Sequence, residues 1–244
     1  MDLRLKVSII IPVYNERHML AQVLERVLAA PLPAGCSREV LVVDDGSTDG
    51  TAQLLEAWER AGAVRVSRSA TNRGKGAALR LGIGQASGDI ILVQDGDLEY
   101  DPRDYVALLE PLVSGREAVV YGSRFLKGSA AGMKPAHWIA NRILALAANL
   151  IYRAGLTDEA TAYKAFRAGL LKSIPLECKR FEFCPEVTAK VRRLGYRIHE
   201  VPVSYNARRV VEGKKIRWHD GFIALWTLVK YRFTSLKPPA EGHP

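Results

Sequence analysis

Two aspartates one residue apart, Asp95 and Asp97 in LVQDGDLEY, directly follow a run of apolar residues at 90–93. Carboxylates this close repel each other unless a divalent cation neutralises them. Their hard oxygen atoms suit Mg²⁺ or Mn²⁺, which also bind phosphate oxygens. The pair therefore predicts a metal clamp that holds a diphosphate and stabilises it as a leaving group. Zinc is not expected, because the five histidines are scattered and no HExxH or Cys/His cluster exists.

The elements that must position this pair alternate along the first half of the chain. Strands are predicted at 7–13, 39–45, 63–69, 89–95 and 117–123, and the first two are apolar, β-branched runs typical of buried strands. Helical patterns lie between the strands, at 19–29, 74–86 and 104–113 among others. Strands that alternate with helices predict an α/β fold. Its central sheet is expected to be Rossmann-like, mostly parallel and flanked by helices.

Polar residues gather where these strands end. In parallel sheets, ligands bind at the carboxyl ends of the strands. Groups at 14–16, 44–45, 95–97 and 122–124 each end or follow a predicted strand. One such group alone could cap a helix or face solvent, but four of them on one rim favour a binding site.

The charge balance points to anionic partners. The 244 residues carry a net charge of +9, which suggests phosphates in a nucleotide, a lipid surface or nucleic acid. No RRM, KH or helix-turn-helix pattern appears, so nucleic acid is not an expected partner. The three cysteines lack CxxC spacing and are expected to be free thiols in a reducing compartment. The opening MDLRLKVSII indicates a strand and not a signal peptide, and no apolar helical run reaches the ~20 residues of a transmembrane span.

Several stretches together resemble a known family. IIIPVYNE (9–16), VVDDGSTDGT (42–51), NRGKGAAL (72–79), GDIILVQDGDLEYDP (88–102) and VVYGSRF (119–125) occur in this order. They resemble the family 2 inverting glycosyltransferases, which have a GT-A fold. Three later stretches resemble the branch of polyprenyl-phosphate (dolichyl-phosphate) sugar synthases: DEATAYKAFR (158–167), FEFCPEVTAKVRRLGYRIHEVPVSY (181–205) and EGKKIRWHDG (212–221).

The resemblance implies a reaction and a domain plan. A metal-dependent enzyme would move a sugar from a nucleoside-diphosphate sugar, of the GDP-mannose or UDP-glucose type, to a polyprenyl-phosphate lipid. One GT-A domain would span 1–235, with a nucleotide-sugar half at about 6–125 and an acceptor half with C-terminal helices at about 126–235. Residues 236–244 would form a flexible tail. Transfer to a hydroxyl of a soluble or glycan acceptor remains the alternative, and a basic nucleic-acid-binding protein is the remote one.

The resemblance also assigns residues to the donor side. The implied ligands of Mg²⁺ or Mn²⁺ are Asp95, Asp97 and Glu99. The implied nucleotide-sugar contacts are Pro12, Tyr14, Glu16, Val43, Asp45, Asp95, Gly96, Asp97, Arg124, Arg208 and Lys214. The last two belong to a basic loop that would close over the diphosphate, with a register ambiguous by one residue.

The implied catalytic residues are Asp158, Asp97 and Arg124, and the implied acceptor contacts are Asp158 and Glu186. A hydroxyl acceptor would need Asp158 as a base, with Glu159 as its competitor. A lipid phosphate is already an anionic nucleophile, so Asp158 would then only orient other groups. Two structural alternatives stay open: Asp158 as a turn residue, and Glu186 on the exposed face of a helix.

Two amphipathic segments bear on the location of the protein. AHWIANRILALAANLIYR (136–153) and WHDGFIALWTLVKYRF (218–233) each carry an apolar stripe with basic residues near it. Such stripes could lie on a bilayer surface, pack on the domain core or contact a membrane partner subunit. We expect a cytoplasmic protein that is peripheral on the cytoplasmic face of a membrane.

Overall fold

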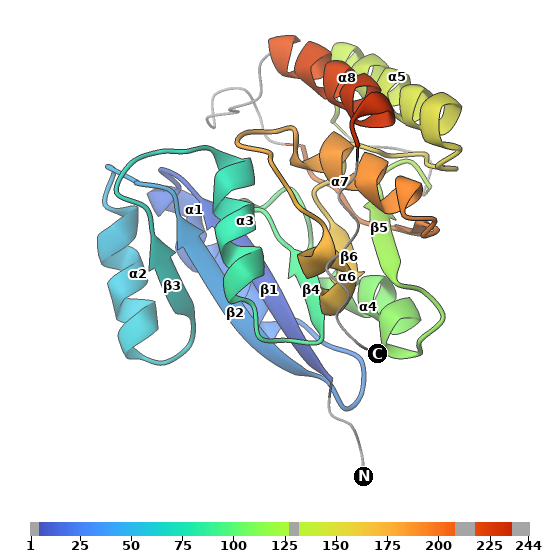
Figure 1. Ribbon diagram of the computed structural model, residues 1–244. Coiled ribbons are helices and arrows are strands. Elements are labelled where there is room, and N and C mark those ends of the chain that lie inside the picture. Colours follow the sequence, from blue (N-terminus) through green and yellow to red (C-terminus); the bar gives the residue numbers. More distant parts are fainter. Residues whose placement is uncertain (1–4, 127–131, 208–217, 236–244) are drawn as a thin grey trace.

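The computed structural model describes residues 5–126, 132–207 and 218–235. Its centre is a seven-stranded sheet with the strand order β3-β2-β1-β4-β6-β5-β7. Helices cover both faces of the sheet, and two more helices lie side by side at one end of the molecule (Figure 1). The strands are β1 (Lys6–Val13), β2 (Ser37–Asp44), β3 (Arg65–Arg68), β4 (Ile90–Val93), β5 (Val119–Ser123), β6 (Lys164–Arg167) and β7 (His199–Pro202).

The described strands confirm the predicted mostly parallel sheet. β1 pairs in parallel with β2 and β4, β2 with β3, and β5 with β7. β6 is antiparallel to both of its neighbours, β4 and β5. All five predicted strands form, but β4 ends at Val93, so Asp95 and Asp97 lie in the loop that follows it.

Two helical layers enclose the sheet. On one face lie α1 and α2, followed by the 3₁₀ helix η1 and α4, and on the other lie α3, α6 and α7, with α5 and α8 stacked beyond α7. Their bounds are α1 (Arg17–Ala29), α2 (Thr51–Arg60), α3 (Lys75–Gln85), η1 (Pro102–Asp104), α4 (Tyr105–Val113), α5 (Pro135–Tyr152), α6 (Ala168–Ser173), α7 (Phe183–Arg193) and α8 (Trp218–Phe233).

The continuous apolar strands supply a core on each face. Ile9 and Ile11 of β1 belong to the core under α1 and α4, whereas Ile10 belongs to the core under α3 and α7. This alternation follows from the two-residue period of a strand. Both faces of β1 are therefore covered by helices, and neither is exposed to solvent. Polar groups of the sheet that can reach a ligand must then lie at the strand ends.

A buried carboxylate ties together the amino-terminal edge of the sheet, opposite the predicted rim. Glu39 of β2 is 7% exposed. Its Oε2 accepts hydrogen bonds from Ser8 Oγ at 2.6 Å and from Ser87 N at 3.0 Å, and Arg65 pairs with Oε1. Burial by itself would raise the pKa of Glu39, but bonds from Ser8, Ser87 and Arg65 lower it to about 2.

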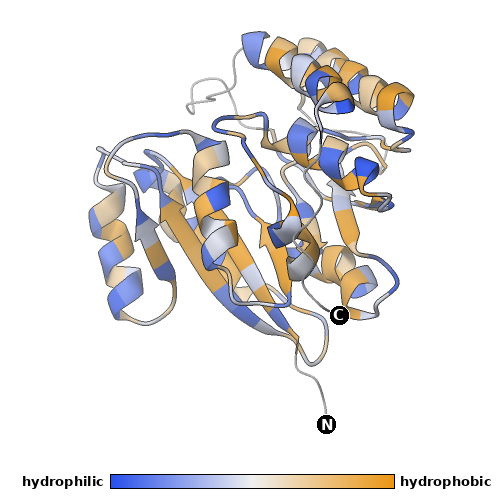
Figure 2. Cartoon of the chain, viewed as in Figure 1, coloured by the Kyte–Doolittle hydropathy of each residue, from blue (hydrophilic) through white to orange (hydrophobic). Residues whose placement is uncertain are grey.

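Helices α5 and α8 leave a broad apolar surface exposed. Figure 2 shows apolar residues along both helices. Leu150 of α5 is 75% exposed and Phe233 of α8 is 84% exposed. The alternative that both stripes pack on the domain core is wrong, because most of the apolar residues of the stripes are exposed to solvent. The large apolar side chains exposed on these two helices are Trp138, Ile139, Ile143, Leu146, Leu150, Phe222, Ile223, Trp226, Val229 and Phe233. Within the described ranges, neither these nor other helices have the length and apolarity that crossing a bilayer requires.

Candidate functional site

The carboxyl ends of β2, β1 and β4 are neighbours, as the sequence predicts for the polar rim. Backbone N of Asp45 donates to the carbonyl oxygen of Val13 at 2.9 Å, which joins the ends of β2 and β1. A β-carbon on Gly96 would lie 2.9 Å from Val13 Cγ1 and 3.3 Å from the carbonyl oxygen of Pro12. Only glycine therefore lets the Asp95–Asp97 loop lie against the end of β1.

Asp45 holds the start of α3 in place. Its side chain is almost fully buried and accepts hydrogen bonds from backbone N of Arg73 at 2.9 Å and of Gly74 at 2.6 Å. Gly74 has φ +95°, and a β-carbon there would lie 2.4 Å from the carbonyl oxygen of Lys179. Asp45 thus has a positioning role in addition to the nucleotide-sugar contact that the family resemblance implies for it.

The loops after β1 and β2 are tied to each other. Asn15 adopts a left-handed conformation, with φ 51°. Its backbone N donates to Ser47 Oγ at 2.9 Å, and its own Oδ1 accepts from Thr48 N at 2.8 Å. The predicted contacts Tyr14 and Glu16 flank Asn15 and are half-buried. Asn15 belongs to the rim group at 14–16 predicted from the sequence, but no ligand contact was predicted for it individually.

Val43 is a core residue. It is fully buried in β2, and its Cγ2 would lie 3.2 Å from a β-carbon placed on Gly82 of α3. Its side chain therefore packs beneath α3. Because the side chain of Val43 is buried, a contact between this residue and a nucleotide would have to be made by its backbone atoms.

The first aspartate of the pair has a cation as its partner. Lys75, the first residue of α3, forms an ion pair with Asp95, and the two side chains are 26% and 18% exposed. Burial by itself would lower the pKa of Lys75, but the charges of Asp95, Cys184 and Asp97 raise it. The ammonium group therefore pairs with Asp95 from the start of the helix, and the charge of Asp97 also acts on it. Lys75 lies in the stretch NRGKGAAL, but no role was predicted for it from the sequence.

The donor set at this loop fits a divalent ion that is completed by its ligand. Mg²⁺ is usually held by one or two carboxylates together with substrate phosphates and water. Asp95 and Asp97 supply two such carboxylates, whereas the described residues contain no group of three side chains that could hold a metal. Glu99 instead accepts a hydrogen bond from Tyr205 Oη at 3.1 Å. Glu99 is therefore left out of the metal site proposed below.

Arg124 and Asp158 form a buried ion pair beyond β5. Asp158 is fully buried and Arg124 is 7% exposed. Asp158 Oδ2 accepts from backbone N and Nε of Arg124 at 3.0 and 2.7 Å, and Oδ1 accepts from Nη2 at 2.7 Å. Burial alone would lower the pKa of Arg124, but Tyr100 and Asp158 raise it well above its ordinary value. The structure thus brings together two predicted catalytic residues, with their charges directed at each other.

The segment that carries Asp158 is anchored by Glu200 of β7 and by Lys164 of β6. The carboxylate of Glu200 accepts hydrogen bonds from backbone N of Thr157 at 2.7 Å and of Asp158 at 2.9 Å. Lys164 is fully buried and donates from Nζ to the carbonyl oxygen of Glu159 at 2.8 Å. Burial raises the pKa of Glu159, and the charge of Lys164 opposes this rise. Glu159 points into the core and does not compete with Asp158 at the rim.

Glu186 has a structural environment. It is fully buried in α7, so the alternative that it lies on an exposed helix face is wrong. Its carboxylate accepts hydrogen bonds from backbone N of Glu177 and of Cys178, each at 2.7 Å, and pairs with Lys190 at 2.5 Å. These bonds fix the turn before α7 and occupy both carboxylate oxygens of Glu186.

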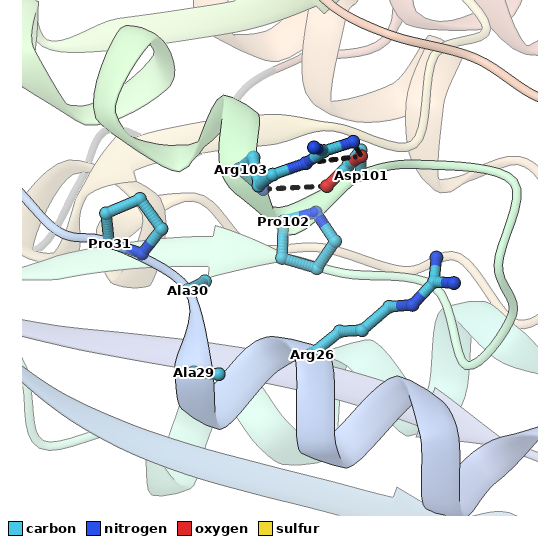
Figure 3. A pocket seen from close by; sticks show the side chains of 7 residues that line it. All are labelled: Arg26, Ala29, Ala30, Pro31, Asp101, Pro102 and Arg103. Carbon is cyan, nitrogen blue, oxygen red and sulfur yellow. Dashed lines mark hydrogen bonds and ion pairs between the residues drawn. The ribbon is translucent and has the colours of Figure 1, made fainter.

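The predicted lid residues Arg208 and Lys214 lie outside the described residues, as does the tail at 236–244. Among the described residues, Figure 3 shows a pocket of about 430 Å³ beside the end of α1 and η1. Arg103 at its edge is paired with Asp101. None of the predicted site residues lines this pocket, which is formed by Arg26, Ala29, Ala30, Pro31, Asp101, Pro102 and Arg103.

Comparison with known families identifies the class of protein. Residues 8–174 match Glycosyl transferase family 2, and this match covers β1 to α6 together with the whole polar rim. The chain belongs to this family. The expectation of a glycosyltransferase drawn from the sequence motifs is confirmed at this level.

Individual relatives in the family are named for lipid-phosphate substrates. The chain is 32% identical to dodecaprenyl-phosphate galacturonate synthase of Rhizobium johnstonii over 84% of its length and 60% of the relative. It is 32% identical to undecaprenyl-phosphate 4-deoxy-4-formamido-L-arabinose transferase of Edwardsiella ictaluri, over 85% and 62%, and 29% identical to dolichol-phosphate mannosyltransferase of Pyrococcus furiosus, over 86% and 59%. The chain thus spans about three fifths of the length of these relatives.

Solved structures share the fold. Glucosyl-3-phosphoglycerate synthase from Mycobacterium tuberculosis, in complex with UDP, superposes with a TM-score of 0.71 at 21% identity, covering 93% of this chain and 80% of that one. The same enzyme in complex with Mn²⁺, UDP and glucosyl-3-phosphoglycerate gives a TM-score of 0.70 at 20% identity, with the same coverage. The predicted GT-A fold class is confirmed.

Proposed function

We propose that this chain is a metal-dependent inverting glycosyltransferase that moves a sugar from a nucleoside-diphosphate sugar to a polyprenyl-phosphate lipid. The observation that carries the choice of acceptor is the buried pair of Arg124 and Asp158. Asp158 is fully buried, and Arg124 occupies three of the roughly four acceptor positions of its carboxylate. A proton taken from a hydroxyl would therefore compete with the ion pair and weaken it. A phosphate acceptor is already an anion and needs no base. The names of the family relatives support the same choice.

The donor would bind at the rim formed by the ends of β1, β2 and β4. Asp95 and Asp97 would hold Mg²⁺ or Mn²⁺, and the bound metal would supply a Lewis acid that stabilises the departing diphosphate. Asp45 fixes the start of α3, whose amino-terminal end favours negative charge. Gly96 lets the acidic loop lie against β1, which keeps both aspartates beside this helix end.

We further propose that the surface formed by α5 and α8 binds an anionic bilayer on the cytoplasmic face of a membrane. The apolar side chains exposed on both helices form a face that suits insertion at the level of the headgroups. Helix α5 contains no acidic residue, and the one acid of α8, Asp220, is buried, whereas Lys230 and Arg232 lie in its last turn. This charge pattern fits anionic lipid better than a neutral surface.

The reaction is tested by supplying donor and acceptor together. Purified protein with Mn²⁺ or Mg²⁺ is given UDP-glucose, UDP-galacturonate or GDP-mannose and undecaprenyl phosphate in detergent, and lipid-linked sugar is detected by mass spectrometry. We expect transfer from one donor, and its loss in Asp97→Asn, which keeps the size of the side chain but removes a metal ligand. Transfer to a glycan or glycerol hydroxyl without transfer to the lipid would establish the alternative acceptor. A folded protein that uses none of the donors would refute the proposal.

The membrane surface is tested by sedimentation with vesicles. We expect binding to phosphatidylglycerol vesicles, little binding to phosphatidylcholine vesicles, and strong weakening in Trp226→Ser, whose side chain is 65% exposed. Val106→Ser is the matched control, because Val106 is an exposed apolar residue of α4, away from this surface. Equal loss of binding in both variants, or a stable dimer in solution without vesicle binding, would contradict the proposal.

A further inference from the structure

Lys75 is a cation at the centre of the proposed donor site that the proposed reaction has not used. It begins α3 immediately after Gly74, whose backbone N is bound by Asp45. Its position is therefore fixed by the same contact that fixes the helix end. Its ammonium group pairs with Asp95 and also lies in the field of Asp97.

This ion pair conflicts with metal binding at the same carboxylate. An ammonium group and a divalent cation that share Asp95 would repel each other, because two like charges at contact distance interact unfavourably even near a protein surface. The repulsion between the Lys75 ammonium group and the metal ion is relieved if the lysine side chain moves away from Asp95. The flexible four-carbon stem of lysine permits this move, and the diphosphate would be the nearest new anion.

We propose that Lys75 is the resident cation of the diphosphate site: it neutralises Asp95 while no donor is bound, and it moves to the phosphate oxygens when the donor binds with its metal ion. The inference rests on the proposed function and goes beyond it, because it assigns a positioning residue and an order of events. Lys75 keeps Asp95 and Asp97 from repelling each other in the free protein, and it adds a contact to the bound diphosphate.

Two opposite effects follow from this exchange. Without nucleotide, Lys75 competes with a metal ion for Asp95 and weakens metal binding. With nucleotide, Lys75 binds the phosphates and strengthens donor binding. Metal and nucleotide must then each raise the affinity for the other by the same factor, because such coupling is reciprocal.

The test measures metal and nucleotide binding separately, without turnover. Free Mn²⁺ is followed by electron paramagnetic resonance in the absence of nucleotide, and binding of UDP and GDP is measured by calorimetry with and without Mn²⁺. Lys75→Met should bind Mn²⁺ alone about tenfold more tightly and UDP or GDP with Mn²⁺ about tenfold more weakly, as expected for one charge-assisted contact. Lys75→Arg, which keeps the charge, should move both affinities back toward the wild type.

Arg80→Met is the matched control, because it also removes one positive charge from α3 but at an exposed position. If Lys75→Met binds Mn²⁺ no more tightly than Arg80→Met does, the exchange is refuted, while metal-dependent nucleotide binding by the wild type would leave the proposed function standing. If the folded wild type binds neither nucleotide with Mn²⁺ or Mg²⁺, the proposed function itself fails. Circular dichroism establishes folding for each variant.

Discussion

Replacement of Asp158 by asparagine separates a structural role from a chemical one. Asp158 is fully buried and accepts three hydrogen bonds from Arg124, two of them from the guanidinium group. Asparagine has nearly the same shape, but its amide has no charge and must direct either an oxygen or an NH₂ group at each guanidinium contact. Asp158→Asn therefore leaves the buried charge of Arg124 without a counter-ion.

The burial of the Arg124–Asp158 pair sets the expected loss of stability. Removal of one partner from a buried ion pair lowers the free energy of unfolding by about 3–5 kcal/mol, because the remaining charge is neither solvated nor paired. Typical domains have about 5–15 kcal/mol in total, so the variant should be folded but clearly less stable. Arg124→Met should be destabilising by a similar amount. The double variant should be less unstable than the sum of the two single variants, because it leaves no unpaired charge.

Urea unfolding at 10 °C and at neutral pH measures these differences, and transfer activity is then determined per folded molecule. We expect Asp158→Asn to lose stability, together with an activity loss that Arg124→Met shares. An Asp158→Asn protein that is within about 1 kcal/mol of the wild type and has lost activity more than ~100-fold would refute this reasoning. That result would make Asp158 a base and would favour a hydroxyl acceptor.

Three further changes test the framework of the site. Glu39→Gln should lower the free energy of unfolding by about 3 kcal/mol at pH 7, since the pKa of Glu39 is lowered to about 2 in the folded protein. This stabilisation is complete above the ordinary pKa and is lost as the pH falls toward 2, so urea titrations of both proteins should converge in acid, and parallel curves would contradict it. Gly74→Ala should weaken nucleotide binding and stability, because of its positive φ and the nearby carbonyl oxygen, whereas Gly84→Ala in the open part of the same helix should be neutral or stabilising by about 0.5–1 kcal/mol. Lys164→Met should destabilise the fold by about 3 kcal/mol, because Lys164 is a buried cation whose charge acts on the buried carboxylate of Glu159. Glu159→Gln added to it should restore part of the loss, and no rescue would show that the two charges are uncoupled.

The fold of the donor half could be predicted from the sequence because its signals are local. Strands β1, β2, β4 and β5 contain continuous apolar runs, as expected for strands buried on both faces, whereas β3 is a short edge strand with the sequence RVSR. β6 was missed for a physical reason. It has four residues and lies between β4 and β5, with which it pairs at long sequence separation, so no local pattern marks it. The apolar stripes of α5 and α8 were recognised, but only the packing of α7 beneath them shows which side is left exposed.

Some residues of the candidate site could likewise be predicted from the sequence, and others could not. Asp45, Asp95 and Asp97 were predicted correctly as neighbours of the rim, because strand ends in a parallel sheet must meet there. Their cation Lys75 was missed because a lysine at the start of a helix carries no signal of its own. Glu186 was predicted as an acceptor contact, but its burial and its bonds to two backbone NH groups could not be read from the sequence.

The charges of the rim suit the meeting of two anions. Under the proposed function, a diphosphate and an acceptor phosphate must come close together, and their repulsion has to be offset by cations that are already in place. The structure holds one such cation on each side, Lys75 near the donor loop and Arg124 beyond β5, and each is paired with an aspartate. The two pairs differ in burial, because the side chain of Lys75 is 26% exposed whereas that of Arg124 is 8% exposed. Lys75 can therefore exchange its partner at low cost, whereas Arg124 is held in its ion pair with Asp158.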